Sequence, residues 1–327
     1  MKFLLIDDEH ELYKIMYADL LNKDCKFEIE EIPKFSKMNK MCTFFNKIHF
    51  DDRINRHFWL PFKSLWDRQY YLNSYNFDET EQYWIIFLNG TFRNYYSIEY
   101  LEKFREKHSN VRLALVMYDN TTNPYAQRVK KMFSCFNRIF SFDQEDCRKY
   151  NFEYIYSTLS KPKFVKKDKE KESSIFFVGS ASGRLNLLHS CMERIIDKID
   201  NYRFYITGVD EKNKKLPIIY NHPISYADTL EYSFNTDCIF EVVKPGQTGI
   251  TLRTCEAIIF NKKLLTNNKA IKDTPFYNEK YMSVFENEED IDLNFISKKI
   301  DINYNYEDWF SPNVIIQKLI KETTNEN

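Results

Sequence analysis

The sequence predicts an α/β protein built from two doubly wound domains in tandem, with a cleft between them. The chain has 327 residues, which corresponds to about two domains of roughly 100–200 residues each. Short apolar runs typical of buried parallel strands alternate with segments of helical spacing along most of the chain. A lysine-rich stretch at 161–171, KPKFVKKDKEK, divides this alternation into two series.

The first series opens with a short apolar strand directly after the initial methionine. Two later runs, WIIFL and VRLALVM, are continuous enough to be buried strands, and the charged, amphipathic segment between them is typical of a surface helix. We expect strands at Lys2–Ile6, Trp84–Leu88, Val111–Met117, Arg138–Phe142 and Tyr154–Tyr156, and helices at Glu11–Leu21, Ile98–Lys107 and Ala126–Phe136.

The stretch at 161–171 contains six lysines and almost nothing to bury, which favours a solvated linker over a basic patch for anionic lipid. The second series follows, with strands at Ile175–Val178, Tyr202–Thr207, Cys238–Val243 and Lys263–Thr266 and helices at Leu185–Ile199, Ala227–Phe234, Thr251–Ile259 and Ser311–Lys321. The expected organisation is a first domain at 1–160, a linker at 161–174, a second domain at 175–305 and a terminal helix within 306–327.

Composition and residue spacing argue against several classes of protein. The net charge of −1 argues against a nucleic-acid binder. The seven cysteines and six histidines are scattered without CxxC, HxH or HxxxH spacing, so we expect no metal and no cofactor. No apolar run approaches the roughly 18 residues of a membrane-spanning helix. The N-terminus turns acidic after five residues and lacks the pattern of a signal peptide, so we expect a cytoplasmic protein.

The densest chemical signal is VKPGQTGITLRTCEAIIFNKKLLTNN at 243–268, where a strand, a Pro-Gly turn and a helix follow one another. Uncapped N–H groups at the start of this helix would form an anion site. Arg253 would contact a phosphate, Glu256 one turn later would accept a ribose diol, and Thr251 would add a short polar contact. The alternative interpretation is a plain strand–turn–helix whose Arg253 and Glu256 pair on the surface. The other candidate donor-site residues in this segment are Lys244, Gln247, Thr248, Gly249 and Asn267.

A second, weaker signal is VGSASGRLNLL at 178–188, a strand-to-helix loop that contains Gly179, Ser180 and Arg184. It has neither the spacing of a P-loop nor a full GxGxxG. Two glycine-bearing loops, each with an arginine near a helix start, are together more informative. They would neutralise a diphosphate leaving group without a metal ion.

The segments FFVGSASGR, ISYADTLEYS and KPGQTGITLRTCEAIIFNKKLLTNN resemble the C-terminal domain of bacterial glycosyltransferases of the GT-B fold that make capsule, lipopolysaccharide or other surface glycans. The resemblance covers about residues 175–285 and implies two Rossmann-like domains. It implies a nucleotide-sugar donor, expected to be a UDP-sugar, and a saccharide or lipid-linked acceptor. By position, it places Glu256 on the donor ribose, and it places Arg253, Thr251 and Gly249 near the diphosphate or sugar, with Arg184 as a second cation. The acidic first loop, Asp7-Asp8-Glu9, departs from the small, glycine-bearing loop of that family.

A base on the first domain would deprotonate the acceptor in an inverting transfer. Candidates at strand ends are Asp7, Asp8, His10 and Asp119, of which Asp8 and Asp119 are our catalytic candidates. Each is equally compatible with an ordinary loop or helix-cap residue. A retaining transfer is compatible with the absence of such a base.

The segment RINRHFWLPFKSLWDRQYY at 53–71 interleaves cations with large aromatic residues. This pattern suits either peripheral contact with the cytoplasmic membrane or ordinary core packing with cations reaching outward.

Parts of the sequence suggest three other functions. A response-regulator receiver is rejected, because Asp51 and Asp52 follow a short, polar KIHF rather than a buried strand. A sugar-nucleotide epimerase or hydrolase would share the scaffold and the donor pocket. A non-catalytic nucleotide-binding partner of another transferase is the third.

Overall fold

The computed structural model describes residues 1–7, 9–22, 25–51, 54–55, 58, 60–88, 95–122, 129–163, 167–244, 246–247 and 249–325. The chain divides into two compact units. The first comprises Met1–Ile155 together with Pro312–Asn327, and the second comprises Tyr156–Ser311. Each unit is described by itself.

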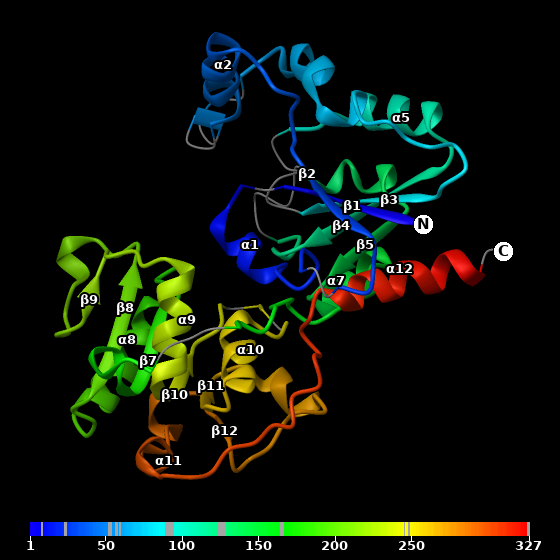
Figure 1. Ribbon diagram of the computed structural model, residues 1–327. Helices are drawn as coiled ribbons and strands as arrows, with labels where there is room; N and C mark the ends of the chain where they lie inside the picture. Colours follow the sequence, from blue (N-terminus) through cyan, green and yellow to red (C-terminus); the bar gives the residue numbers. More distant parts are fainter. Residues whose placement is uncertain are drawn as a thin grey trace. The chain divides into compact units, whose positions relative to one another are not determined.

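The first unit contains a six-stranded sheet in the order β2-β1-β3-β4-β5-β6, with every neighbouring pair parallel (Figure 1). Its strands are β1 (Lys2–Ile6), β2 (Ile29–Ile32), β3 (Tyr83–Leu88), β4 (Val111–Met117), β5 (Arg138–Ser141) and β6 (Glu153–Tyr154). Its α-helices are α1 (Glu11–Met16), α2 (Lys40–Phe50), α5 (Ile98–Lys107), α7 (Gln144–Tyr150) and α12 (Asn313–Asn325), and its 3₁₀ turns are η1 (Lys63–Gln69), η2 (Tyr71–Asn73) and η3 (Phe133–Cys135).

The second unit repeats this architecture with a parallel sheet in the order β12-β11-β10-β7-β8-β9. Its strands are β7 (Ser173–Ser180), β8 (Tyr202–Thr207), β9 (Ile219–Tyr220), β10 (Thr236–Glu241), β11 (Lys263–Thr266) and β12 (Met282–Val284). Its α-helices are α8 (Leu185–Ile196), α9 (Tyr226–Asn235), α10 (Leu252–Ile259) and α11 (Leu293–Ser297), with 3₁₀ turns η4 (Lys169–Lys171), η5 (Glu211–Asn213), η6 (Lys269–Asp273) and η7 (Glu288–Asp290). Strand β11 is buried from end to end, and β10 is buried at every residue except Asp237, as a sheet covered on both faces requires.

Several predicted elements need correction. The first helix ends at Met16 rather than Leu21, and Tyr17 and Leu20 are buried in the turn that follows it. The expected strand at Cys238–Val243 lies at Thr236–Glu241 instead. The predicted helix at Ala126–Phe136 ends in η3, and residues 126–128 lie outside the described residues. KIHF, judged above too short and polar for a buried strand, is the last turn of α2.

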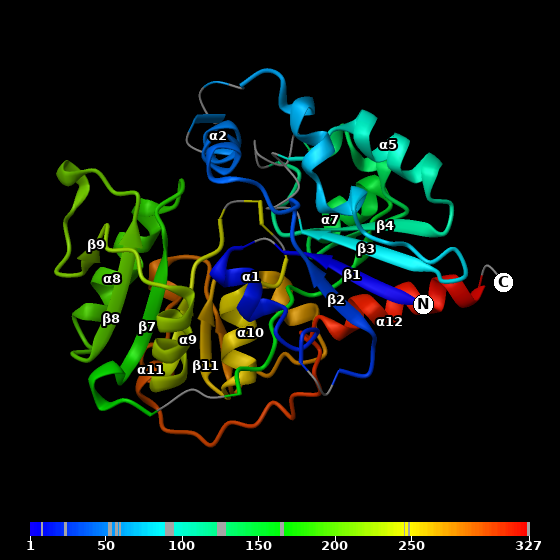
Figure 2. The same cartoon turned by 45° about the horizontal axis from the view of Figure 1, so that its top comes forward.

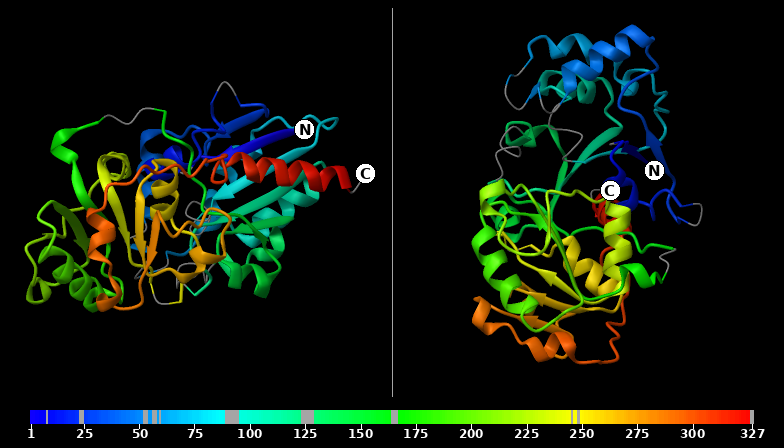
Figure 3. Two further views of the ribbon diagram at one scale, coloured as in Figure 1. Left: turned by 90° about the horizontal axis from the view of Figure 1, so that it is seen from below. Right: turned by 90° about the vertical axis from the view of Figure 1, so that its left-hand side faces the viewer.

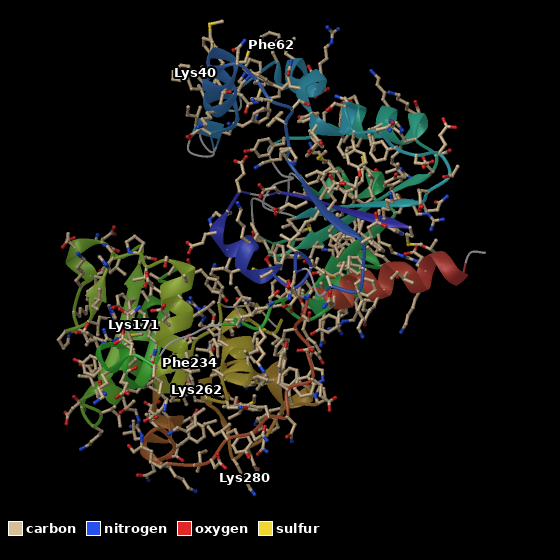
Figure 4. The ribbon with its side chains drawn as sticks, viewed as in Figure 1. Lys40, Phe62, Lys171, Phe234, Lys262 and Lys280 are labelled. Carbon is tan, nitrogen blue, oxygen red and sulfur yellow. The ribbon has the colours of Figure 1, made fainter. Side chains whose placement is uncertain are left out.

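The end of the expected linker is packed rather than solvated. Lys171, labelled in Figure 4, forms ion pairs with Asp228 (3.3 Å) and Glu231 on α9. A guanidinium nitrogen of Arg203 donates to the Glu170 carbonyl at 2.6 Å. These contacts anchor the segment that leads into β7.

The C-terminal helix α12 packs on the first unit, alongside its strands (Figure 3). Ile315, Ile316 and Leu319 are fully buried, and Trp84 on β3 donates to the Thr323 hydroxyl at 3.3 Å. An ion pair joins Lys318 to Glu153 at 2.7 Å. In the part of the chain that the structure describes, no helix combines the length and the apolar character needed to cross a bilayer.

Candidate functional site: a polar pocket at the strand crossover of the second unit

The second unit contains the crossover point at which doubly wound sheets bind ligands. From β7 the chain proceeds outward to β8 and β9, whereas β10, on the other side of β7, leads to β11 and β12. The connections after β7 and β10 therefore leave in opposite directions and open a crevice at the carboxyl ends of these two strands.

A pocket of about 610 Å³ lies at this position. It brings together residues from both glycine-bearing loops and from the end of β11, and four of them are predicted donor-site residues: Arg184, Lys244, Gln247 and Asn267. The remaining lining residues are Gly183, Leu185, Asn186, Leu187, Val243 and Gly246.

The N-terminus of α8 forms one wall of the pocket. Arg184 occupies the N-cap position but its side chain makes no capping hydrogen bond, and the next three residues all line the pocket. The first N–H groups of a helix have no partner within it, and the helix dipole favours negative charge there. The start of this twelve-residue helix is thus suited to an anionic group such as a phosphate.

Arg184 supplies a cation beside these N–H groups. Its Nε donates to the Ser180 carbonyl at 3.2 Å, and its guanidinium lies 5.9 Å from the centre of the Phe177 ring. Burial lowers the pKa of this guanidinium, and the nearby Glu241 carboxylate opposes that shift. A Cβ atom on Gly179 would lie 2.9 Å from Nη2 of Arg184, so the glycine leaves room for the arginine.

The opposite wall is the turn after β10. Gly246 has a φ of +78°, a left-handed conformation that favours glycine. The Gln247 amide donates to the Lys244 carbonyl at 3.0 Å, and the Val243 amide donates to Oδ1 of Asn267 at 2.7 Å. The exposed Lys244 adds a second cation to the lining. Pro245 and the predicted Thr248 lie outside the described residues.

The start of α10, expected to be an uncapped anion site, is capped. The Thr251 hydroxyl accepts the Arg253 amide at 3.1 Å and also bonds the Glu241 carboxylate. Gly249 contributes its carbonyl, which accepts from Nδ2 of Asn268 at 3.0 Å. These residues are absent from the described lining of the pocket. The open helix N-terminus therefore belongs to the segment at 178–188, the weaker of the two sequence signals.

Arg253 and Glu256 pair with each other, but the pair is buried rather than on the surface as the alternative interpretation expected. The Glu256 side chain is 0% exposed and that of Arg253 is 15% exposed. Glu256 also accepts hydrogen bonds from Tyr226 at 2.9 Å and Ser233 at 2.6 Å. Burial raises the pKa of Glu256, and Arg253 counteracts this shift.

Glu241 is a buried acidic residue that sequence reasoning missed. It ends β10, is 2% exposed, and accepts from the Thr254 hydroxyl at 3.1 Å as well as from the hydroxyls of Thr251 and Thr266. It therefore ties the start of α10 to the end of β11. A glutamate that closes the buried run CIFE was the available signal.

The acceptor-side candidates lie at the carboxyl edge of the first unit's sheet. Asp119 follows β4 and is half-buried, and the same loop is anchored where the Thr121 amide donates to Asp146 at 2.7 Å. Asp7 accepts the Glu9 amide at 2.7 Å, and His10 caps α1. Asp8 lies outside the described residues. Since β3 separates β1 from β4, the ends of these two strands are about 10 Å apart.

Metal binding has no obvious centre. Within the described ranges, no three His, Cys, Asp or Glu side chains gather in a group that could hold a metal ion.

The chain matches no protein-family model and no curated protein sequence. Among solved structures, a Listeria monocytogenes protein assigned as a UDP-N-acetylglucosamine 2-epimerase aligns with a TM-score of 0.56 at 10% identity, covering 100% of this chain and 97% of that one. The UDP-GlcNAc 2-epimerase of Neisseria meningitidis bound to UDP-GlcNAc gives 0.51 at 10% identity, with coverages of 98% and 100%. Anabaena HepE in complex with UDP and glucose gives 0.50 at 8% identity and covers both chains fully.

Identities this low establish the fold alone. The chain has the GT-B architecture of two Rossmann-like α/β domains, and the predicted fold class is confirmed.

Proposed function

We propose that this protein is a glycosyltransferase that moves a sugar from a nucleotide diphosphate sugar, most simply a UDP-sugar, to a saccharide acceptor. The observation that carries the proposal is the crossover pocket, in which Arg184, Lys244 and the open N-terminus of α8 converge. Three sources of positive potential at one site suit a diphosphate, which carries its charge on adjacent phosphates. Neighbours of the same fold were solved with UDP or UDP-GlcNAc, which supports this choice of ligand.

In this proposal Arg184, Lys244 and the α8 amides hold the diphosphate and stabilise the charge that develops as it leaves. Further polar contacts to the donor are proposed for Asn267, Gln247, Thr248 and Ser180. Gly179 is proposed to let the loop backbone approach the donor closely. Glu256 is the proposed acceptor of the ribose hydroxyls. That role requires Arg253 and Tyr226 to release Oε1, or Ser233 to release Oε2, when the nucleotide binds. No metal ion or other cofactor is needed, because the cations and the helix dipole neutralise the leaving group.

The acceptor is proposed to be a surface glycan or a lipid-linked saccharide of the capsule or lipopolysaccharide type, handled at the inner face of the cytoplasmic membrane. Asp8 or Asp119 would take the proton of its attacking hydroxyl, as an inverting transfer requires.

A sugar-nucleotide epimerase or hydrolase is the second candidate. Two of the structural neighbours are named as UDP-GlcNAc 2-epimerases, and that reaction would use the same diphosphate pocket. A silent nucleotide-binding partner of another transferase is the third.

Incubation with UDP-, dTDP- and CDP-sugars, with and without saccharide and lipid-linked acceptors, separates these candidates. A transferase releases the nucleotide at an appreciable rate only when an acceptor is present. An epimerase converts the donor sugar without an acceptor, a hydrolase releases nucleotide and free sugar without one, and a silent partner binds without turnover. Conversion of the donor sugar, or release of the nucleotide, at the same rate with and without an acceptor would overturn the transferase assignment.

A further inference from the structure

The helix α2 of the first unit turns an apolar stripe toward solvent. Met41, Phe44, Phe45 and Ile48 follow the i, i+3, i+4, i+7 spacing of one helix face. They are 67%, 60%, 55% and 39% exposed. Asn46 and Phe50 are buried on the opposite side of the helix. The helix is therefore anchored by one face and presents a second apolar face to the outside.

The exposed stripe continues onto η1. Leu65 is 73% exposed, and Phe62, held at a left-handed φ of 63°, is 72% exposed. A groove of about 440 Å³ joins the two segments, lined by Cys42, Phe45, Ile48, His49, Leu65, Trp66 and Gln69. Of the eleven large apolar residues that are exposed among those described, eight lie in this region: Met41, Phe44, Phe45, Ile48, Ile54, Phe58, Phe62 and Leu65. These eight residues are here called the α2 face.

The underside of the α2 face is fixed to the rest of the unit by aromatic packing. Phe50 stacks on Tyr95 with ring centres 4.7 Å apart, and Phe35 stacks on Tyr70 at 5.2 Å. Trp66 donates through Nε1 to His49 at 2.6 Å. Figure 1 and Figure 2 both show α2 standing clear of the sheet of its own unit. The exposed face is thus a supported surface, and none of the described residues of this unit forms a further layer over it.

The charge around the α2 face indicates what covers it. Among the described residues of 34–68 that are not buried, four lysines and one arginine stand against two aspartates, a net charge of +3 in a chain whose total is −1. Lys40 and Lys47, one heptad apart on α2, are both exposed, and Figure 4 shows Lys40 and Phe62 on this same projection. A second copy of the chain would bring two such positive regions together, which Coulomb repulsion disfavours. An anionic partner is favoured.

We infer that the α2 face docks on the surface of a bilayer rich in anionic phospholipid. Exposed aromatic and aliphatic side chains flanked by lysines are suited to the headgroup boundary, where the rings enter the apolar edge and the ammonium groups contact phosphates. The surface lies in the first unit, whereas the nucleotide pocket lies in the second. The inference deepens the membrane location given under the proposed function, and vesicle binding tests it without relying on the transfer reaction.

Vesicle co-sedimentation of the full chain tests this inference. Binding is expected to vesicles made of equal parts phosphatidylcholine and phosphatidylglycerol, to weaken when salt is raised, and to be at least about tenfold weaker with phosphatidylcholine alone. The Phe62→Ser/Leu65→Ser variant should bind the anionic vesicles at least about tenfold more weakly. The Lys40→Glu/Lys47→Glu variant should lose binding to a similar extent, since the two charge reversals remove contacts with anionic headgroups and add repulsion.

The matched control is Leu21→Ser/Ile219→Ser, which removes two exposed aliphatic side chains outside the α2 face and should bind like the wild type. Thermal melting verifies that each variant is folded, as substitutions at exposed positions should allow. Failure to bind anionic vesicles, equal binding of wild type and both variants, or self-association that the Phe62→Ser/Leu65→Ser variant abolishes while vesicle binding persists, would each overturn the inference.

Discussion

Glu256 and Arg253 form a buried ion pair between the first and second turns of α10, with the carboxylate 0% and the guanidinium 15% exposed. Oε1 of Glu256 accepts from both Arg253 and Tyr226, and Oε2 accepts from Ser233. The carboxylate thus links α9 to α10 through hydrogen bonds within the protein. Its role in the fold and its proposed role toward the ribose must be separated by experiment.

Removal of the Glu256 carboxylate should destabilise the second unit. Glu256→Ala leaves the Arg253 guanidinium largely buried without its partner, and breaking a buried pair costs about 3–5 kcal/mol. Urea unfolding followed by circular dichroism measures this loss. Glu193→Ala on the exposed side of α8 is the control and should change stability by less than about 0.5 kcal/mol. A loss below about 1 kcal/mol for Glu256→Ala would mean that the pair contributes little to the fold.

Glu256→Gln tests the proposed contact with the ribose. The amide keeps the shape of the side chain and one acceptor oxygen, so the variant should fold better than Glu256→Ala. It replaces the carboxylate by a weaker acceptor for ribose hydroxyls, and UDP affinity measured by calorimetry should fall about tenfold. Unchanged affinity in a folded Glu256→Gln protein would remove Glu256 from the binding site.

Arg184 should dominate diphosphate binding. Arg184→Ala removes a charge-assisted contact beside the α8 N-terminus, and UDP affinity should fall by at least about tenfold. Arg194→Ala, near the other end of the same helix, is the matched control and should leave UDP binding unchanged. Equal affinities for the two variants would contradict the assignment of the pocket.

Gly179→Ala should disturb Arg184 without a large effect on the fold. The added Cβ would lie 2.9 Å from Nη2 of Arg184 and 3.1 Å from the Phe177 ring, closer than ordinary contacts. The guanidinium must shift, and UDP affinity should fall a few-fold while the melting temperature changes little. Ser190→Ala on α8 serves as the control. Wild-type affinity in Gly179→Ala would show that the position of the guanidinium is not critical.

Asp67 on η1 should make stability depend on pH. Burial raises the pKa of its carboxyl to about 6, and the neighbouring Glu99 adds to that shift. The folded state therefore binds the proton more tightly than the unfolded state, whose pKa is about 3.9. Stability should rise as pH falls from about 7 to about 4.

Asp67→Asn removes this dependence. Two pKa units correspond to about 2.7 kcal/mol, which partial exposure reduces to about 1 kcal/mol. The variant should be more stable than the wild type by that amount at pH about 7.5, and the difference should vanish near pH 4. Melting temperatures of both proteins across this range measure the effect. A difference that stays constant with pH would contradict the raised pKa.

Transfer activity should persist in EDTA. In the proposed mechanism Arg184, Lys244 and the α8 dipole neutralise the diphosphate, so chelation should change the rate by less than about twofold. Nucleotide release assayed with EDTA and again with added Mg²⁺ provides the comparison. Abolition by EDTA and recovery with Mg²⁺ would overturn the metal-independent mechanism.

The regular core of both units was predictable because its signals are local. Five elements have the bounds that the sequence predicts: Lys2–Ile6, Ile98–Lys107, Val111–Met117, Tyr202–Thr207 and Lys263–Thr266. Their signals, continuous apolar runs and amphipathic spacing, depend only on neighbouring residues. The edge strand β2, with Glu30 and Glu31 exposed, and the two-residue β9 carry no comparable run. Their place is fixed by pairing with β1 and β8.

The amino-acid sequence by itself determined the doubly wound class and the two glycine-bearing loops of the candidate site, because burial periodicity and glycine positions can be read directly from the chain. Only the tertiary structure decided how those loops are used. It left the start of α8 open, closed the start of α10 with Thr251, and joined Arg184 to Lys244 and Asn267 in one pocket. It also turned the apolar stripe of α2 outward rather than into the core. Strand pairing, the meeting of the two loops in one pocket and the direction of a helix face depend on partners far away in sequence, and folding alone brings those partners together.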